Sequence, residues 1–196
     1  MLILLAVLLL PYLVTPFYRT GHPVSALMAW RWITGAPVAR QWIDFNAISP
    51  TLPRTVVGSE DAKFCSHRGV DWSALQDAIY DAEDGEPARG GSTITQQVTK
   101  NLFLWPGQSW IRKGLEAYFT LVIETFWSKT RILEVYLNVA EIGPGVFGVG
   151  AASEHFFRQS AARLNRSQSA LLAAVLPNPT LLRVNAPSRY VRTRQA

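Results

Sequence analysis

A mainly α-helical fold is predicted by three features of this 196-residue chain. Apolar residues recur at helical spacing through most of it, and Ser, Thr or Asp stands where several of these runs begin. No alternating apolar and polar run is long enough to support a large sheet. The pattern therefore favours a core of helices around a cleft, with room for one small hairpin.

Composition and charge limit the class of protein. Hydrophobic residues make up 48% of the sequence and charged residues 17%, which excludes a disordered chain. The net charge of +5 indicates an anionic partner, which could be nucleic acid, anionic lipid or a phosphorylated substrate. Cys65 is the only cysteine, so an intramolecular disulfide and a thiolate zinc site are excluded.

Residues 1–18 carry no charge. Eighteen helical residues span about 27 Å, which is just enough for the hydrocarbon core of a bilayer. We therefore expect a transmembrane anchor there, although Pro11 and Pro16 interrupt the run and no Lys or Arg precedes it. The alternative is the apolar region of a signal peptide, with residues 26–29 as a poor cleavage candidate.

Residues 19–54 form a connector rich in tryptophan. Trp30 and Trp32 flank Arg31, and a ring beside a charged head just outside a membrane span suits the lipid interface. Packing of a short helix on the core explains the same residues equally well. The connector ends at Pro50 and Pro53.

The stretch that organises the chain runs from Gly58 to Asp71. It holds two adjacent acids, Glu60 and Asp61, and a carboxylate pair on a turn before a helix is one way to hold an acid near a cleft. Taken alone, the pair could simply solvate a loop.

Asp71 is the expected N-cap of the next helix, in which Leu75, Ile79 and Ala82 would form one buried stripe. A loop rich in glycine and charge follows, from Asp84 to Gly91.

The next helix is expected to begin with a capping box between Thr93 and Gln96. Its apolar stripe is Ile94, Val98 and Leu102. Free amides at a helix start, followed by hydroxyl and amide side chains, suit sugar hydroxyls and phosphate oxygens. The alternative is an ordinary solvated helix start.

A third helix is predicted by an apolar stripe at Ile111, Leu115, Phe119, Val122 and Phe126. Glu116 lies beside this stripe, and two bases, Arg112 and Lys113, precede it by four and three residues. Such a trio could be an ordinary surface ion pair.

Three further features complete the chain. Ser128 is expected to cap a helix that runs through Asn138, with Glu134 either facing solvent or paired with a base. Residues 143–150 predict a turn where backbone approaches backbone, followed by a helix. Ser167 is the expected cap of an alanine and leucine helix that stops at Pro177, and a basic tail at residues 183–196 touches anionic lipid or is solvated.

Four motifs stand in order along the chain. The first, ED-x-x-F-x-x-H-x-G-x-D, falls on Glu60, Asp61, Phe64, His67, Gly69 and Asp71. The second, GGSTITQQ with a following lysine and asparagine, falls on Gly90 to Gln97, Lys100 and Asn101. The third, RK-x-x-E, falls on Arg112, Lys113 and Glu116, and the fourth, ILE-x-YLN, on Ile132 to Asn138. Together they resemble glycosyltransferase family 51, the biosynthetic peptidoglycan transglycosylases, which occur as monofunctional enzymes and as the glycosyltransferase domain of class A penicillin-binding proteins.

The resemblance implies a lysozyme-like domain, here at residues 55–182, with a catalytic cleft and a small jaw that faces the membrane. It implies a single-pass protein of the bacterial inner membrane whose catalytic domain is periplasmic. Its substrates would be lipid II and the growing lipid-linked glycan strand, its partners other cell-wall synthesis proteins, and nucleic acid is not expected. No transpeptidase region follows residue 196, so crosslinking is expected of another protein.

The resemblance also assigns roles. Glu60 is the expected base that deprotonates the 4-hydroxyl of the incoming lipid II, with inversion as the lipid pyrophosphate leaves. Glu116 would assist at the donor side by orienting basic residues or a metal. Phosphate and substrate contacts are expected from Lys100, Arg112, Lys113, Ser92, Gln96 and Gln97. Structural roles are expected for Asp61, Phe64, His67, Gly90 and Gly91, with His67 bracing the loop. No metal ligands are predicted, and the cofactor is undetermined, a divalent cation at the donor pyrophosphate being the open alternative.

Two other functions remain open from the residues alone. A glycan-cleaving enzyme, such as a lysozyme or a lytic transglycosylase, also uses carboxylates in a helical cleft, but has little use for a cationic cluster. A non-catalytic membrane-bound scaffold that binds lipid II is the second alternative.

Overall fold

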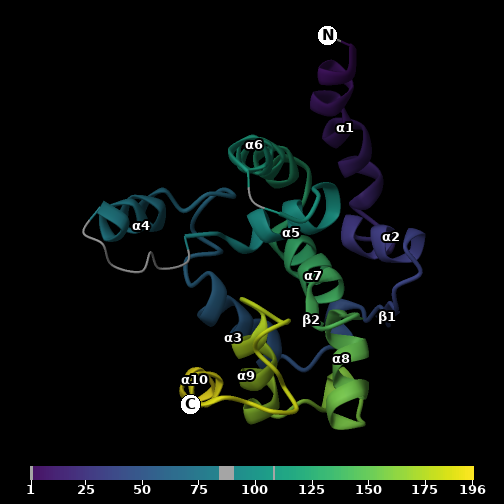
Figure 1. The fold of residues 1–196 in the computed structure, drawn as a ribbon, viewed down its shortest axis with the longest axis vertical. Coiled ribbons are helices and arrows are strands. Elements are labelled where there is room, and N and C mark those ends of the chain that lie inside the picture. Colours follow the sequence, from purple (N-terminus) through teal and green to yellow (C-terminus); the bar gives the residue numbers. More distant parts are fainter. Residues whose placement is uncertain (1, 84–90, 108) are drawn as a thin grey trace.

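The computed structural model describes residues 2–83, 91–107 and 109–196, and these are mainly helical, as predicted (Figure 1). The helices are α1 (Leu2–Tyr18), α2 (Ala26–Ile33), α3 (Thr51–Glu60), α4 (Trp72–Glu83), α5 (Ile94–Phe103), α6 (Trp110–Phe126), α7 (Lys129–Val139), α8 (Gly148–Phe157), α9 (Arg166–Val175) and α10 (Arg189–Gln195). Two short 3-10 turns are η1 (Phe45–Ala47) and η2 (Ala161–Arg163).

A small three-stranded sheet contains the hairpin for which the sequence left room. Its strands are β1 (Ala39–Arg40), β2 (Glu141–Gly143) and β3 (Val146–Phe147), in the order β1-β3-β2. β2 and β3 pair antiparallel, and β1 from the connector adds to β3 in parallel, with Ala39 opposite Val146. The turn predicted at residues 143–150 is therefore a hairpin that runs into α8.

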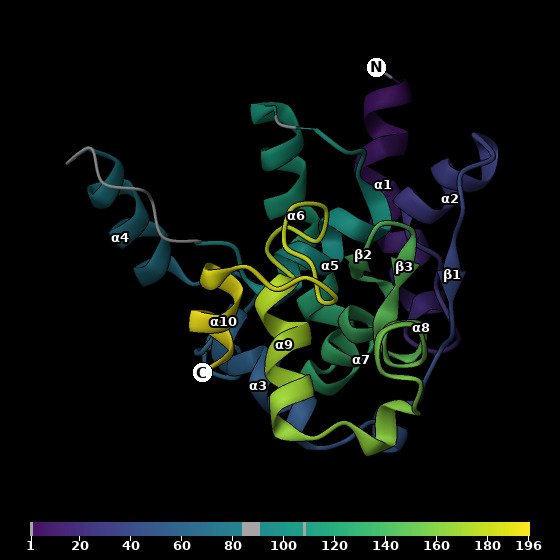
Figure 2. The ribbon, with the colours of Figure 1, turned by 60° about the horizontal axis from the view of Figure 1, so that its bottom comes forward.

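The core forms around α7, which lies in the middle of the molecule (Figure 1). α5 packs on both α6 and α7, and α3 packs on α9 (Figures 1 and 2). The apolar spacing of α7 predicts burial of Ile132, Leu133, Tyr136 and Leu137, and all four are buried, with Tyr136 among the largest fully buried side chains described. Burial of this apolar surface is the main force that holds α5 against α7.

Two predicted buried positions are wrong. Ile111 is 76% exposed because it lies in the first turn of α6, and the buried stripe of this helix begins further along, at Phe119. Leu75 is 36% exposed because α4 projects from the body (Figures 1 and 2). The side chains of Ile79 and Ala82 and most of the predicted loop, residues 84–90, lie outside the described residues.

Most helix starts follow the predicted chemistry. The Asp71 carboxylate accepts from the Ala74 amide, and Ser128 caps α7. Thr93 and Gln96 form the expected capping box of α5. The predicted cap at Ser167 is wrong: α9 begins two residues earlier, because Asn165 caps it and forms a capping box with Gln168.

The N-terminal segment packs against the rest of the chain. α1 contacts α6, and the Trp127 indole N–H donates to the Thr15 carbonyl at 2.7 Å. Within residues 2–83, 91–107 and 109–196, no helix combines the length and apolarity needed to cross a bilayer.

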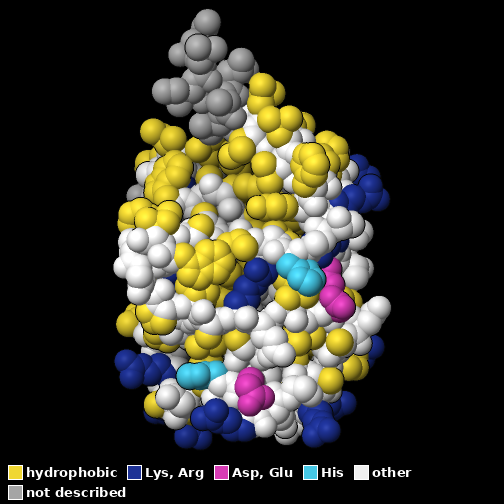
Figure 3. All heavy atoms as spheres, turned by 90° about the vertical axis from the view of Figure 1, so that its right-hand side faces the viewer, with side chains coloured by type: hydrophobic (Ala, Val, Ile, Leu, Met, Phe, Trp, Pro, Cys, Tyr) yellow, Lys and Arg dark blue, Asp and Glu magenta, His cyan; other side chains and the backbone are white. Residues whose placement is uncertain are grey.

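The connector packs on the core and also exposes aromatic rings. Met28 and Ile48 are buried, while Trp30 and Trp32 are more than half exposed. Arg31 joins α2 to β2 by an ion pair with Glu141 at 2.6 Å. On the face shown in Figure 3, hydrophobic side chains gather in the half nearer the N-terminus, whereas Lys and Arg lie mostly at the other end.

Two glycines differ in the space around them, so replacement by alanine should change the stability of the fold in opposite directions. A Cβ at Gly150 would overlap the Gln41 carbonyl oxygen, whereas a Cβ at Gly114 in α6 meets no atom within 4 Å. We expect Gly150→Ala to destabilise the fold by about 1–3 kcal/mol. Gly114→Ala should stabilise it by about 0.5–1 kcal/mol, because alanine favours the helix. Thermal unfolding in detergent measures both, and similar melting temperatures for the two variants would contradict this packing.

Candidate active site

Glu60, the last residue of α3, lies in a protected position. Its side chain is 7% exposed. One carboxylate oxygen accepts from the Gln97 amide nitrogen at 3.1 Å, and the other lies 3.5 Å from the Arg194 guanidinium. Burial raises the pKa of Glu60, and Gln97, Arg194 and Lys100 partly oppose this rise. A carboxylate of raised pKa beside a cavity can accept a proton from a substrate hydroxyl.

Asp61 joins the loop after α3 to the start of α5. Its carboxylate accepts from His67 Nε2 at 2.8 Å and from the Ile94 backbone N–H at 2.9 Å. The second bond places a negative charge at the N-terminus of α5, where the helix dipole favours it. His67 therefore contacts Asp61 and lies in the loop that it was expected to brace.

The rest of the first motif packs around this junction. The Thr93 hydroxyl donates to the Gly69 carbonyl. Gly69 has φ +86°, and a Cβ there would come within 2.7 Å of a methyl group of Thr120, so only glycine fits. Phe64 is 1% exposed, with the Lys129 ammonium 4.5 Å from its ring centroid.

A second charged cluster lies on α6. Glu116 is 3% exposed and accepts from Arg112 at 2.9 Å and from Lys113 at 2.5 Å. The alternative of an ordinary surface ion pair is wrong for Arg112 and Glu116, because both are buried. Lys113 also donates to the Ser92 hydroxyl at 3.1 Å, which joins this cluster to the second motif. Arg112 Nε is buried and has no hydrogen-bond partner among the described residues.

Lys100, on α5, lies within the electrostatic reach of both clusters. The side chain of Lys100 is accessible to solvent, but the protein around it removes part of its hydration, and this desolvation lowers the pKa of Lys100. The positive charges of Arg112 and Lys113 lower this pKa further. The charges of Glu116 and Glu60 oppose this. The two acids therefore act on one ammonium group.

Gln97 and Glu60, which contact each other, line two different cavities. The larger, about 460 Å³, is lined by Gln97, Lys100 and Arg112, together with Trp105 and Tyr136. The smaller, about 270 Å³, is lined by Glu60 and its neighbours in sequence, together with residues from the start of α4 and from the segment before α5. These other lining residues are Gly58, Ser59, Asp61, Ala62, Lys63, Asp71, Ala74, Gly91, Ser92 and Thr93. A substrate that spans both would touch the acid at one end and the cations at the other.

The remaining predicted site residues have other places. The Gln96 side chain is buried, and its amide oxygen accepts from the Thr93 N–H, so this oxygen serves the helix cap. Gly91 lines the smaller cavity, and Gly90 lies outside the described residues. Within the described parts of the chain, no group of three or more His, Cys, Asp or Glu could hold a metal ion.

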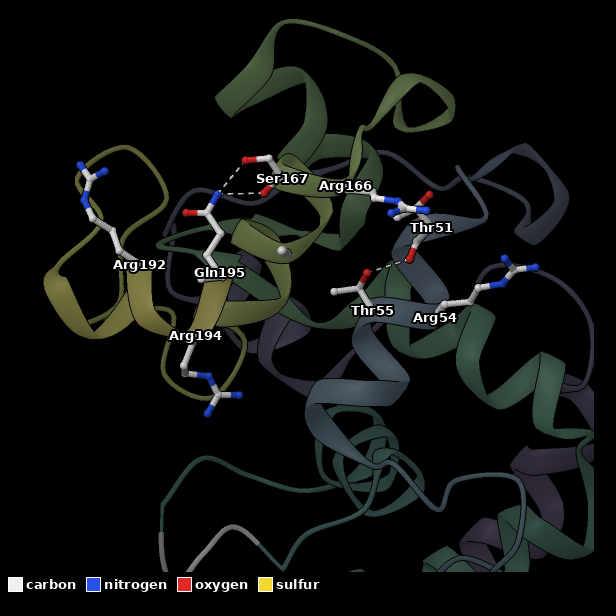
Figure 4. A pocket seen from close by; sticks show the side chains of 10 residues that line it. Thr51, Arg54, Thr55, Arg166, Ser167, Arg192, Arg194 and Gln195 are labelled. Carbon is white, nitrogen blue, oxygen red and sulfur yellow. Dashed lines mark hydrogen bonds between the residues drawn. The ribbon is translucent and has the colours of Figure 1, made fainter.

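The C-terminal helix supplies a residue that sequence reasoning missed. α10 packs on α9, and the Gln195 side chain of α10 donates to Ser167 of α9. Arg194, also on α10, reaches Glu60. A further hollow of about 790 Å³ lies between α3, α9 and α10 (Figure 4). Its rim is basic, with Arg54, Arg166, Arg192 and Arg194. No spacing in the sequence links residue 194 to residue 60, and the basic residues of the tail suggested only lipid or solvent.

Comparison with known proteins gives one consistent result. A family model described as Transglycosylase matches residues 28–196. The biosynthetic peptidoglycan transglycosylase of Nitrobacter winogradskyi is 60% identical over 189 residues, which cover 96% of this chain and 84% of that protein. The protein of the same name from Rhodopseudomonas palustris strain TIE-1 is 59% identical over 192 residues, covering 97% and 81%. That from Caulobacter vibrioides is 52% identical over 172 residues, covering 88% and 75%.

The junction at Asp61 predicts a large loss of stability on its removal. Asp61→Ala leaves His67 and the Ile94 N–H without their acceptor, and each buried donor left unsatisfied costs about 1–3 kcal/mol. Asp61→Asn keeps one acceptor oxygen, so we expect a smaller loss. The matched control is Asp77→Ala, at an exposed position of α4, which should change the free energy of unfolding by less than about 0.5 kcal/mol. Equal unfolding curves for the two alanine variants would show that the junction contributes nothing.

Proposed function

This chain belongs to the family of biosynthetic peptidoglycan transglycosylases, and from that membership we propose that it polymerises lipid II into glycan strands. It is a transferase of peptidoglycan synthesis, and its substrates are lipid II and the growing lipid-linked strand. Since both substrates carry lipid tails, it acts at the bacterial membrane that holds them, with its catalytic domain on the periplasmic side.

The observation that supports this reaction best is the arrangement around Gln97. A buried carboxylate, Glu60, lies on one side of this residue, and Lys100 lies one turn further along the same helix. Glycosyl transfer with a pyrophosphate leaving group needs both charges: a base for the attacking hydroxyl and cations for the departing diphosphate.

In the proposed step, Glu60 takes the proton of the acceptor's 4-hydroxyl as that oxygen attacks the anomeric carbon of the donor. The new C–O bond forms on the face opposite the lipid pyrophosphate. The bond from the anomeric carbon to the phosphate oxygen breaks, and its electron pair leaves with the diphosphate. A single displacement of this kind inverts the anomeric centre.

The donor pyrophosphate is assigned to the cationic cluster. Lys100, Arg112 and Lys113 offset its charge, and the buried Arg112 Nε offers a donor that no described protein group uses. Glu116 holds Arg112 and Lys113 in place through its two ion pairs. These side chains do not fit a divalent cation, because both oxygens of Glu116 already accept from positive groups and Lys100 adds a third positive charge.

Incubation of the protein with labelled lipid II in detergent tests the proposal. Formation of glycan polymer supports it. Cleavage of preformed glycan without polymer would instead support the glycan-cleaving enzyme, and binding of lipid II without any product would support the scaffold.

Glu60→Gln should abolish polymerisation while lipid II binding is retained, since the amide cannot accept the hydroxyl proton. The same change should raise the melting temperature near neutral pH. A carboxyl whose pKa is raised by folding destabilises the folded state above that pKa, and this penalty vanishes below the ordinary value of 4.5, where the group is protonated in both states. The gain in melting temperature should therefore disappear as the pH falls. A variant that still polymerises at the wild-type rate would remove Glu60 from the mechanism.

Lys100→Met should lower kcat/KM for lipid II by about 10²-fold, because it removes a cation that offsets charge on the leaving group. The control is Arg163→Met, which removes one positive charge from the exposed turn η2. Rates of polymerisation at fixed ionic strength measure both. Equal effects of the two changes would mean that only the overall charge matters and that Lys100 has no specific contact.

A further inference from the structure

A chain of two hydrogen bonds runs from the core to Glu60. The Tyr136 hydroxyl on α7 donates to Gln97 Oε1 at 3.0 Å. The nitrogen of the same amide donates to Glu60 Oε2 at 3.1 Å. Tyr136 is 1% exposed, and its ring belongs to the hydrophobic core.

The order of these bonds matters because the two ends of a glutamine amide are opposite in character. The oxygen only accepts and the NH₂ group only donates, and the terminal torsion of the side chain allows either end to face a given neighbour. An ionised Glu60 can only accept, so it needs the NH₂ end. A neighbour that donates to the Gln97 oxygen from the opposite side therefore decides that the NH₂ group faces Glu60.

Tyr136 is such a neighbour. Burial and the charge of Glu60 raise the pKa of Tyr136 well above its ordinary value of 10.0, so the hydroxyl keeps its proton. Its ring is fixed by the core, and its hydroxyl has one hydrogen-bond partner among the described residues, the Gln97 oxygen. A tyrosine hydroxyl can also accept, but if the amide were turned round, the Tyr136 proton would have no acceptor among the described residues, so the hydroxyl donates to the Gln97 oxygen.

We propose that Tyr136 is a positioning residue of the active site, which fixes the Gln97 amide so that its NH₂ group faces the Glu60 carboxylate. This inference rests on the proposed function, since it concerns the base of that reaction. It adds to that function a role for the fourth motif, whose residues otherwise serve the core.

Loss of the Tyr136 hydroxyl frees the amide to turn. With its oxygen toward Glu60, the amide would repel the carboxylate and stabilise the protonated acid instead. The other groups that face Glu60 are Arg194 on α10, Lys100 on α5 and the neighbouring Asp61, and none of them contacts the Tyr136 hydroxyl. The expected result is a Glu60 carboxyl of higher pKa, so that a smaller fraction of it is ionised and able to take a proton near neutral pH.

The first test is Tyr136→Phe, which keeps the buried ring. We expect kcat/KM for lipid II near neutral pH to fall about five- to tenfold, which is within the range for loss of one hydrogen bond between neutral groups. The acid limb of the pH–rate profile should move to higher pH, and part of the lost rate should return there. Tyr80→Phe, at an exposed position on α4, is the matched control and should change neither.

A double-mutant cycle separates positioning from a general structural effect. If Tyr136 acts only through Gln97, then Tyr136→Phe should cost nothing further in a Gln97→Leu background. Additive losses would overturn the inference, because they would show that the tyrosine acts through other contacts.

A measurement without turnover completes the design. The carboxyl carbon of Glu60, assigned in ¹³C-labelled protein with the help of Glu60→Gln, should titrate at higher pH in Tyr136→Phe than in the wild type. An unchanged titration and an unchanged pH profile, in a wild-type protein that does polymerise lipid II, would refute the role of Tyr136 alone. Absence of polymer from the wild type would instead refute the proposed function.

Discussion

The site depends on one buried carboxylate, that of Asp61. It accepts at once from His67, in the loop after α3, and from the first backbone amide of α5. Glu60 is its neighbour in sequence, and Gln97 lies three residues into α5, so the 3.1 Å contact between them exists only while loop and helix are held together. The carboxylate also satisfies two buried donors that would otherwise lack a partner, which is why the junction is both costly to break and geometrically defined.

The charged groups of the site oppose stability in a way that suits catalysis. Desolvation raises the pKa of Glu60 and lowers that of Lys100, so each charged form is less favourable here than in water. Such shifts are typical of active sites, where the fold pays a cost in stability for reactivity. Glu116 differs, because two cations satisfy it. The acid that would move a proton is the one that lacks full compensation.

Local chemistry explains what could be predicted from the sequence. Helix starts at Thr93 and Ser128 follow from side-chain hydrogen bonds within four residues, and the motifs carry the acids and cations that the structure brings together. The errors arise where packing between distant segments decides. Ile111 has helical spacing but no residue in the described part of the chain covers it, and Arg194 meets Glu60 only because α10 folds back onto α9. Asn165 is a different case, because its capping box with Gln168 is a local signal that the sequence itself carries and that the prediction of Ser167 overlooked.

Helix α7 shows how a motif can act on a site that it does not enter. Tyr136 holds the Gln97 amide on one side of the helix, and Asn138, which is fully buried, bonds both the N–H and the carbonyl of Ile43 on the other. A rotation of α7 that kept its apolar residues in the core would still break one of these polar contacts. The polar residues of α7 thus fix the helix about its own axis, which apolar packing alone does loosely because it is non-directional. Since α5 packs directly on α7 and Gln97 accepts from Tyr136, this fixed rotation acts together with the Asp61 junction to hold Gln97 beside Glu60.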